Sequence, residues 1–174
     1  MTSHQDPQVA QLIAKLDLQP HPEGGWYKET YRSSDTIGAA GLPDRFGGES
    51  AKSAATGIYF LLTCENFSAF HKIKSDEGWH FYAGPGGLRV YDISPTTGEM
   101  TVHRLGPGED EVFQSWVPAN HWFGSRVEGK GNWALVGCTV SPGFEFADFE
   151  MAKRKDLLAA FPQHQQIIQE LTRE

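Results

Sequence analysis

The dominant pattern along the chain is a succession of short apolar or alternating segments, each bounded by glycine, proline or small polar residues. Strand-length segments separated by turn residues, at intervals of roughly 8 to 12 residues, are typical of a β-sandwich or barrel. We count about nine such segments and therefore predict an all-β fold. They cover residues 26–33, 56–62, 68–74, 77–82, 88–93, 100–105, 112–117, 121–127 and 133–140.

Helical periodicity is confined to the two ends of the chain. Asp6 and Pro7 form an N-cap and first-turn signal, and apolar residues follow at helical spacing. We predict a helix there that ends near Leu18. Near the other end, residues 151–161 are predicted to be helical, and a second helix is predicted over residues 163–172, after a break at a proline.

Length and composition favour a single domain. The chain has 174 residues, of which 39% are hydrophobic and 12% aromatic, which is enough to build one core. We predict one domain over residues 1–174, with the barrel and its flanking elements at about 12–160. Residues 35–54 are rich in Gly, Ala and Ser and lack a hydrophobic period. We predict a partly mobile loop there, suited to act as a lid.

Charge excludes several classes of partner. The net charge is −7 and the isoelectric point about 5.5, without long runs of Lys or Arg, so we expect neither nucleic acid nor an anionic membrane as partner. No apolar run approaches the roughly 18 residues of a transmembrane helix. The first eight residues lack a signal-peptide pattern. Cys64 and Cys138 have no CxxC partner, so we interpret them as buried reduced thiols and expect a cytoplasmic protein.

Candidate chemistry lies in residues 68–84. If residues 68–74 form a strand and the chain turns at residues 75–76, a hairpin would place His71 opposite Glu77 on a concave inner surface. An imidazole and a carboxylate in reach of each other can exchange a proton or bind a metal. The competing interpretation of Glu77 is a structural ion pair with an arginine or lysine, since a buried carboxylate requires a partner.

Further candidates come from a strand with two polar faces and from aromatic residues. Residues 26–33 alternate, but neither face is apolar, which favours a strand that lines a polar pocket or a solvated edge strand. Aromatic side chains in the later strands can line the same pocket. The predicted ligand-binding residues are Lys28, Glu29, Arg32, Tyr59, Trp79, His80, Tyr82 and Trp122.

Two segments resemble the motifs of the cupin superfamily. The first motif has the spacing His-x-His, three or four residues, Glu, six residues, Gly, which matches His71, Glu77 and Gly84, with Ile73 where the second histidine would stand. The second motif, Pro-x-Gly followed by any two residues and then His, is similar to residues 118–123. There an asparagine takes the glycine position and a phenylalanine takes the position of the last metal-binding histidine.

The chain more closely resembles a small cupin subfamily, domain of unknown function 985, over about residues 12–160. The similar blocks are HPEGG (21–25), ETYRS (29–33), SDEGWH (75–80), VPA with a following Trp (117–122) and GCTVSPGF (137–144). This resemblance implies a double-stranded β-helix jelly roll, a homodimer and a pocket open at one end. In architecture the subfamily is similar to the dTDP-sugar 3,5-epimerases.

We predict that the protein binds a small polar organic ligand. Three hypotheses for its function follow, and whether it is an enzyme stays open. The favoured one is a metal-independent isomerase or epimerase for a sugar-like or keto-acid substrate, with His71 as general base tuned by Glu77. In that reaction Lys28, Arg32 or Tyr82 would hold the enolate oxygen.

The second hypothesis is an enzyme that depends on a divalent metal, which would be held by His71, Glu77 and either His80 or His121. The third is a non-catalytic module that binds its ligand with aromatic side chains. No cofactor is favoured.

Overall fold

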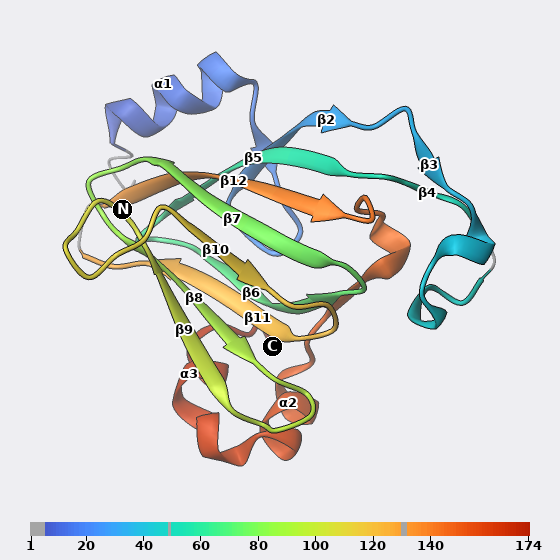
Figure 1. Ribbon diagram of the computed structural model, residues 1–174. Coiled ribbons are helices and arrows are strands. Elements are labelled where there is room, and N and C mark those ends of the chain that lie inside the picture. The colour runs from blue at the N-terminus through green and yellow to red at the C-terminus, as the bar shows by residue number, and fades with distance from the viewer. Residues whose placement is uncertain (1–5, 49, 130–131) are drawn as a thin grey trace.

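Two antiparallel sheets stack face to face in the computed structural model, which describes residues 6–48, 50–129 and 132–174 (Figure 1). One sheet has six strands in the order β1-β2-β5-β12-β7-β10, with bounds Gln19–Pro20, Trp26–Arg32, Thr56–Thr63, Trp133–Ser141, Asp76–Ala83 and Gln114–Val117. The other has five strands in the order β13-β6-β11-β8-β9, with bounds Phe149–Met151, Phe67–Ile73, Trp122–Val127, Leu88–Ile93 and Met100–Leu105. The predicted all-β jelly roll is confirmed.

The main core fills the space between the two sheets, because alternate side chains of every long strand point inward. Phe60 and Val136 come from the six-stranded sheet, and Val90 and Phe123 come from the five-stranded sheet. All four are at most 1% exposed. The apolar residues that alternate along the sequence therefore form the inner face of each sheet.

The connection between β6 and β7 differs from the predicted hairpin. Both strands form where expected, but β6 pairs with β11 and β13, whereas β7 pairs with β12 and β10. The short turn around Ser75 carries the chain from one sheet to the other. Each strand buries one face against the opposite sheet, so the two are neighbours across the core rather than partners along a ladder.

Helix α1, Pro7–Leu16, covers part of the outer face of the six-stranded sheet. Asp6 caps it, because its Oδ1 accepts a hydrogen bond of 2.8 Å from the backbone N–H of Gln8. Its apolar stripe, with Val9 buried, packs on Leu61 and Leu135, whose side chains point away from the main core. The predicted N-terminal helix is confirmed.

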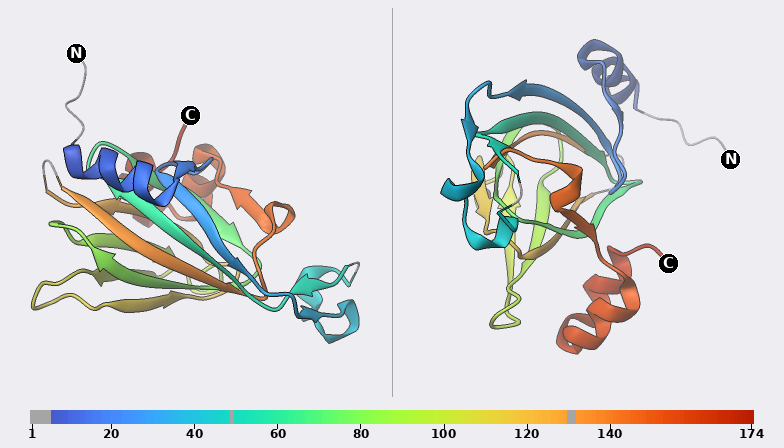
Figure 2. Two further views of the ribbon diagram at one scale, coloured as in Figure 1. Left: turned by 90° about the horizontal axis from the view of Figure 1, so that it is seen from above. Right: turned by 90° about the vertical axis from the view of Figure 1, so that its right-hand side faces the viewer.

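Helices α2, Arg154–Ala160, and α3, Gln165–Glu170, cover the outer face of the five-stranded sheet, opposite to α1 (Figures 1 and 2). Leu157 and Ile168 pack there on Phe70. The helix predicted to begin at residue 151 begins at Arg154, because β13 extends the sheet alongside β6 through Met151. This pairing satisfies the backbone groups of a segment whose sequence alone favours a helix.

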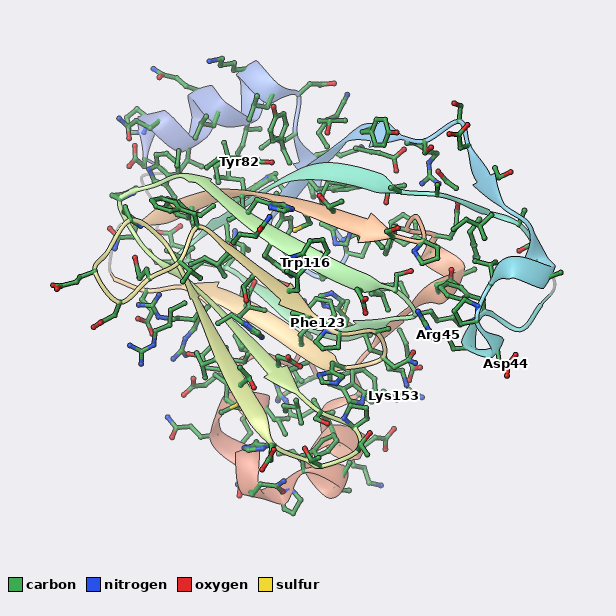
Figure 3. All side chains as sticks on the ribbon, viewed as in Figure 1. Asp44, Arg45, Tyr82, Trp116, Phe123 and Lys153 are labelled. Atoms are coloured by element: carbon green, nitrogen blue, oxygen red, sulfur yellow. The ribbon has the colours of Figure 1, made fainter. Side chains whose placement is uncertain are left out.

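Residues 35–54 contain more structure than a plain loop. They include the two-stranded sheet of β3, Thr36–Ile37, and β4, Lys52–Ser53, and two short 3-10 turns, η1, Ala39–Gly41, and η2, Asp44–Phe46. The segment projects beyond one end of the barrel, and Arg45 of η2 donates a 2.6 Å hydrogen bond to the carbonyl of Lys74 (Figures 1 and 3). Within the described residues, no helix is long and apolar enough to cross a membrane.

Candidate functional site

A cavity of about 230 Å³ lies between the two sheets. It reaches the surface where Phe146, 53% exposed, forms part of its rim. His71 of β6 and Glu77 of β7 enter it from different sheets. The other lining residues are Gln19, His21, Glu23, Tyr27, Lys28, Glu29, Arg32, Thr56, Ile58, Phe60, Ile73, Cys138, Val140, Phe144 and Glu145.

His71 is held in one orientation and one tautomer. Its Nδ1 lies 2.7 Å from the carbonyl oxygen of Ala69, and since a carbonyl only accepts, Nδ1 carries the hydrogen. In the neutral ring, Nε2 is then free to accept a proton. The ring is 2% exposed and lies 4.2 Å from the ring centre of Phe123, and this burial lowers the pKa of His71 to about 4. The imidazole is therefore neutral at neutral pH.

Glu23 is the nearest acid to His71. Its Oε2 lies 3.2 Å from Nε2 of His71 and 3.4 Å from Nδ1 of His21, and its Oε1 accepts a 2.8 Å hydrogen bond from Ser68. Burial raises the pKa of the Glu23 carboxyl, although the neighbouring His21, Ser68 and Arg173 oppose that rise. Glu23 and His71 thus form a buried acid–imidazole pair on one wall of the cavity.

A tight turn places Glu23. The chain reverses at Gly24 and Gly25, whose φ angles of 118° and 72° suit glycine and few other residues. Arg173 holds the turn from outside, with its Nη2 donating a 2.7 Å hydrogen bond to the backbone oxygen of Glu23. Neither Glu23 nor His21 is among the site residues predicted from the sequence. The one sequence signal for them was the HPEGG block shared with the cupin subfamily.

Glu77 occupies the opposite wall. Its side chain points inward from β7 and is hydrogen-bonded to the thiol of Cys138 on β12. Burial, followed by the negative charge of Glu23, raises the pKa of Glu77 to about 8, and the Cys138 hydrogen bond opposes that rise. The alternative interpretation, an ion pair with arginine or lysine, is not observed for Glu77 among the described residues.

Three of the predicted ligand-binding residues lie at the rim of the cavity. Arg32 donates hydrogen bonds to Glu29, of 3.0 and 2.8 Å, and to Glu145, of 2.7 Å. The Nζ of Lys28 lies 2.6 Å from a carboxylate oxygen of Asp17. Each cation therefore has an acidic partner already, and a ligand would have to compete for it.

The other five predicted residues lie outside the lining of the cavity. The alternation that turns Glu77 inward turns His80 and Tyr82 outward, where His80 contacts Thr139 and Tyr82 is 55% exposed (Figure 3). Trp79 points inward but is 1% exposed within the main core. The remaining two are also on outer surfaces: they are Tyr59, which contacts Tyr82, and Trp122, which packs beside the C-terminal helices.

The residues of this site do not fit a resident metal ion. His80 lies on the outer face of its sheet, and His121 lies elsewhere, with its Nδ1 2.6 Å from Asp92. Ile73 and Phe123, which offer no donor atom, take the positions at which the cupin motifs have histidines. In the described parts of the chain, no group of three His, Cys, Asp or Glu side chains is arranged to hold a metal.

Comparison with known proteins identifies one family and several relatives. The family model described as "Cupin superfamily (DUF985)" matches residues 10–152. A hypothetical protein from Leishmania major superposes with a TM-score of 0.84 at 32% identity, covering 95% of this chain and 98% of that one. A crystal structure from Shewanella oneidensis gives 0.81 at 39% identity, covering 94% and 96%. An uncharacterised Saccharomyces cerevisiae protein is 30% identical over 159 residues, 86% of this chain and 78% of that one.

Proposed function

The chain belongs to the DUF985 family of the cupin superfamily, and we propose that it is a metal-independent isomerase or epimerase acting on a small sugar-like or keto-acid molecule. One observation carries the proposal. His71 and Glu77 line a single cavity from opposite sheets, and burial moves their pKa values in opposite directions, to about 4 and about 8. At neutral pH the cavity therefore offers a proton acceptor and a proton donor at once.

The two protonation states suit proton transfer next to a carbonyl group. Nε2 of His71 would accept the proton from the carbon atom beside the carbonyl, and the protonated carboxyl of Glu77 would donate a hydrogen bond to the oxygen on which negative charge develops. The epimer forms if the protonated Glu77, on the opposite wall, gives its proton to the other face of that carbon while His71 keeps the proton it removed. The isomer forms if His71 returns its proton to the neighbouring carbon. Neither outcome requires a group outside the chain.

Glu23 would assist the base. A neutral imidazole in a dry site is a weak base, because the cation formed on proton transfer lacks water around it. The Oε2 of Glu23, 3.2 Å from Nε2, is placed to stabilise that cation. We assign Glu23 as the residue that makes proton transfer to His71 feasible.

The size and walls of the cavity indicate the substrate class. A volume of about 230 Å³ is large enough for one sugar ring or a short keto acid. The rings of Tyr27, Phe60, Phe144 and Phe146 line the cavity beside its polar groups. Aromatic faces pack well against the C–H faces of a sugar, and the polar groups would orient its hydroxyl and carbonyl groups.

The test is hydrogen exchange into a bound ligand. Monosaccharides, sugar phosphates and keto acids are first screened by thermal shift, and each compound that raises the melting temperature is then incubated with the protein in D₂O and followed by NMR. We expect deuterium to enter at the carbon beside the carbonyl. His71→Ala should lower the exchange rate by about 100-fold or more while ligand binding persists.

A matched control separates base catalysis from a general effect of losing a histidine. His80→Ala removes an imidazole from the outer face of β7, outside the cavity, and should leave hydrogen exchange at the wild-type rate. Ligand binding without exchange would instead identify a binding module. Exchange that persists unchanged in His71→Ala would refute the assignment of the base.

A further inference from the structure

A second polar cluster lies away from the cavity and joins both sheets. Asp92 of β8 contacts two imidazoles: its Oδ2 lies 3.2 Å from Nε2 of His103 on β9, and its Oδ1 lies 2.6 Å from Nδ1 of His121. The Oγ of Ser115 on β10 lies 2.6 Å from Nδ1 of His103. None of the four lines the cavity described above.

Elementary chemistry fixes which group donates and which accepts in each hydrogen bond of this cluster. The carboxylate of Asp92 only accepts, so His103 carries its hydrogen on Nε2 and His121 carries its hydrogen on Nδ1. In neutral His103, Nδ1 then has a free lone pair, which faces Ser115. The hydroxyl of Ser115 therefore donates to His103, which in turn donates to a carboxylate that is 5% exposed. A nucleophilic serine is activated by this arrangement, in which a base accepts from the hydroxyl and a third group orients the base.

The cluster sits where the edges of the two sheets part. Strands β9 and β10 are the outermost strands of their sheets, and Leu105 at the end of β9 forms a bridge with Val112, two residues before β10, from where the two strands diverge (Figure 1). Ser115 is partly exposed in this region. Just before it in the chain, Val112 and Phe113 are 50% and 65% exposed, which is unusual for two adjacent apolar residues. Trp116 points to the other face of β10, where it packs on His80 and Gly78.

We propose that Ser115 is a nucleophile toward small apolar carboxylic esters, with His103 as its general base and Asp92 as the residue that positions His103. Oγ of Ser115 forms a bond to the carbonyl carbon as its proton passes to Nδ1 of His103. The bond from that carbon to the alcohol oxygen breaks, and His103 returns the proton to the departing alcohol. Water then attacks the acyl-serine, again through His103, which releases the carboxylic acid and restores Ser115. The exposed side chains of Val112 and Phe113 would bind the hydrocarbon part of the ester.

Covalent labelling of the intact protein tests this inference. A fluorophosphonate reacts with an activated serine by forming an Oγ–P bond and releasing fluoride, so intact-mass and peptide mass spectrometry report both the adduct and its position. We expect one adduct, on Ser115, together with hydrolysis of p-nitrophenyl butyrate. His103→Gln should lower the labelling rate by about 100-fold or more. Ser115→Ala should abolish both signals, and Ser34→Ala, which removes an exposed serine, should change neither.

Mapping the adduct in the wild-type protein keeps the test decisive even if a variant is unstable. An adduct on Ser115 that requires folded protein supports the proposal. No adduct above that of the urea-denatured protein, or an adduct on another residue, overturns it. An equal labelling rate in folded His103→Gln also overturns it, because an unactivated hydroxyl would then account for the reaction.

Discussion

Replacing Glu77 by Gln tests the electrostatics of the cavity without requiring a substrate. The pKa of Glu77 rises from its usual 4.5 to about 8 in the folded protein. Between those values the folded state binds a proton that the unfolded state has released, so wild-type stability falls as pH rises through this window. Glutamine keeps the size and hydrogen-bonding capacity of the protonated acid but cannot ionise. The variant should therefore escape that loss.

The size of the effect follows from both buried groups. Below pH 6.5 His71 works in the opposite direction, because its pKa falls from 6.5 to about 4 and the unfolded state binds the additional proton there. The two contributions largely cancel between about pH 4.5 and 6.5. From pH 6.5 to 8 Glu77 acts without that opposition, and at about 1.4 kcal/mol per pH unit its ionisation should account for a loss of about 2 kcal/mol in the wild-type protein.

Urea unfolding followed by tryptophan fluorescence, measured every half pH unit from 5 to 9, provides the comparison. The free energy of unfolding of wild type should fall above pH 6.5, whereas that of Glu77→Gln should fall much less. Glu65→Gln, at an exposed position, should follow the wild-type curve. Parallel curves for wild type and Glu77→Gln would refute the assignment of a protonated Glu77, and with it the proton donor of the proposed reaction.

Three further substitutions test the packing of the fold by urea unfolding. Leu62→Ala removes most of a side chain that is 1% exposed in the main core and should lower the free energy of unfolding by about 2–5 kcal/mol. A loss under about 1 kcal/mol would contradict that packing. Lys52→Met removes the cation that lies 2.6 Å from the buried carboxylate of Asp148, which keeps Lys74 at 3.3 Å, and should cost about 1–3 kcal/mol, part of which Lys52→Met combined with Asp148→Asn should recover. Gly84→Ala puts a Cβ atom 2.3 Å from the Trp133 carbonyl oxygen at a φ of 144°, so we expect a loss of about 1–3 kcal/mol, and an unchanged midpoint would show that the turn relaxes.

Local physics accounts for the strands that the sequence predicts. Alternation and the glycine and proline turns depend on neighbouring residues, so each of the nine predicted segments overlaps one of the longer strands to within one or two residues at each end. Strands of two or three residues, such as β1 and β13, are too short to show a period. Their pairing depends on a distant partner, which is why β13 was not predicted and the helix was expected to begin at Met151.

The cavity was predictable in part for the same reason. Alternation alone indicates that Glu77 faces inward, and applied consistently it also excludes His80 and Tyr82 from that face. Glu23 could not be found in this way, because its approach to His71 depends on how a glycine turn packs against a strand far away in the sequence. The polar cluster at Ser115 could not be found either, because it joins strands of two sheets and no local pattern in the sequence shows that these strands lie close together.

The hydrogen bond from Arg173 to the backbone of Glu23 spans 150 positions of sequence. The guanidinium of Arg173 also lies 4.7 Å from the ring centre of Phe67, so Arg173 contacts both the glycine turn and β6. A substitution at position 173 would therefore loosen the acid that faces His71 without touching any residue of the cavity. In a library of random variants, changes at position 173 would disturb the Glu23–His71 pair while leaving the overall fold intact, and in an assay of the proposed reaction they would resemble damage to His71 itself.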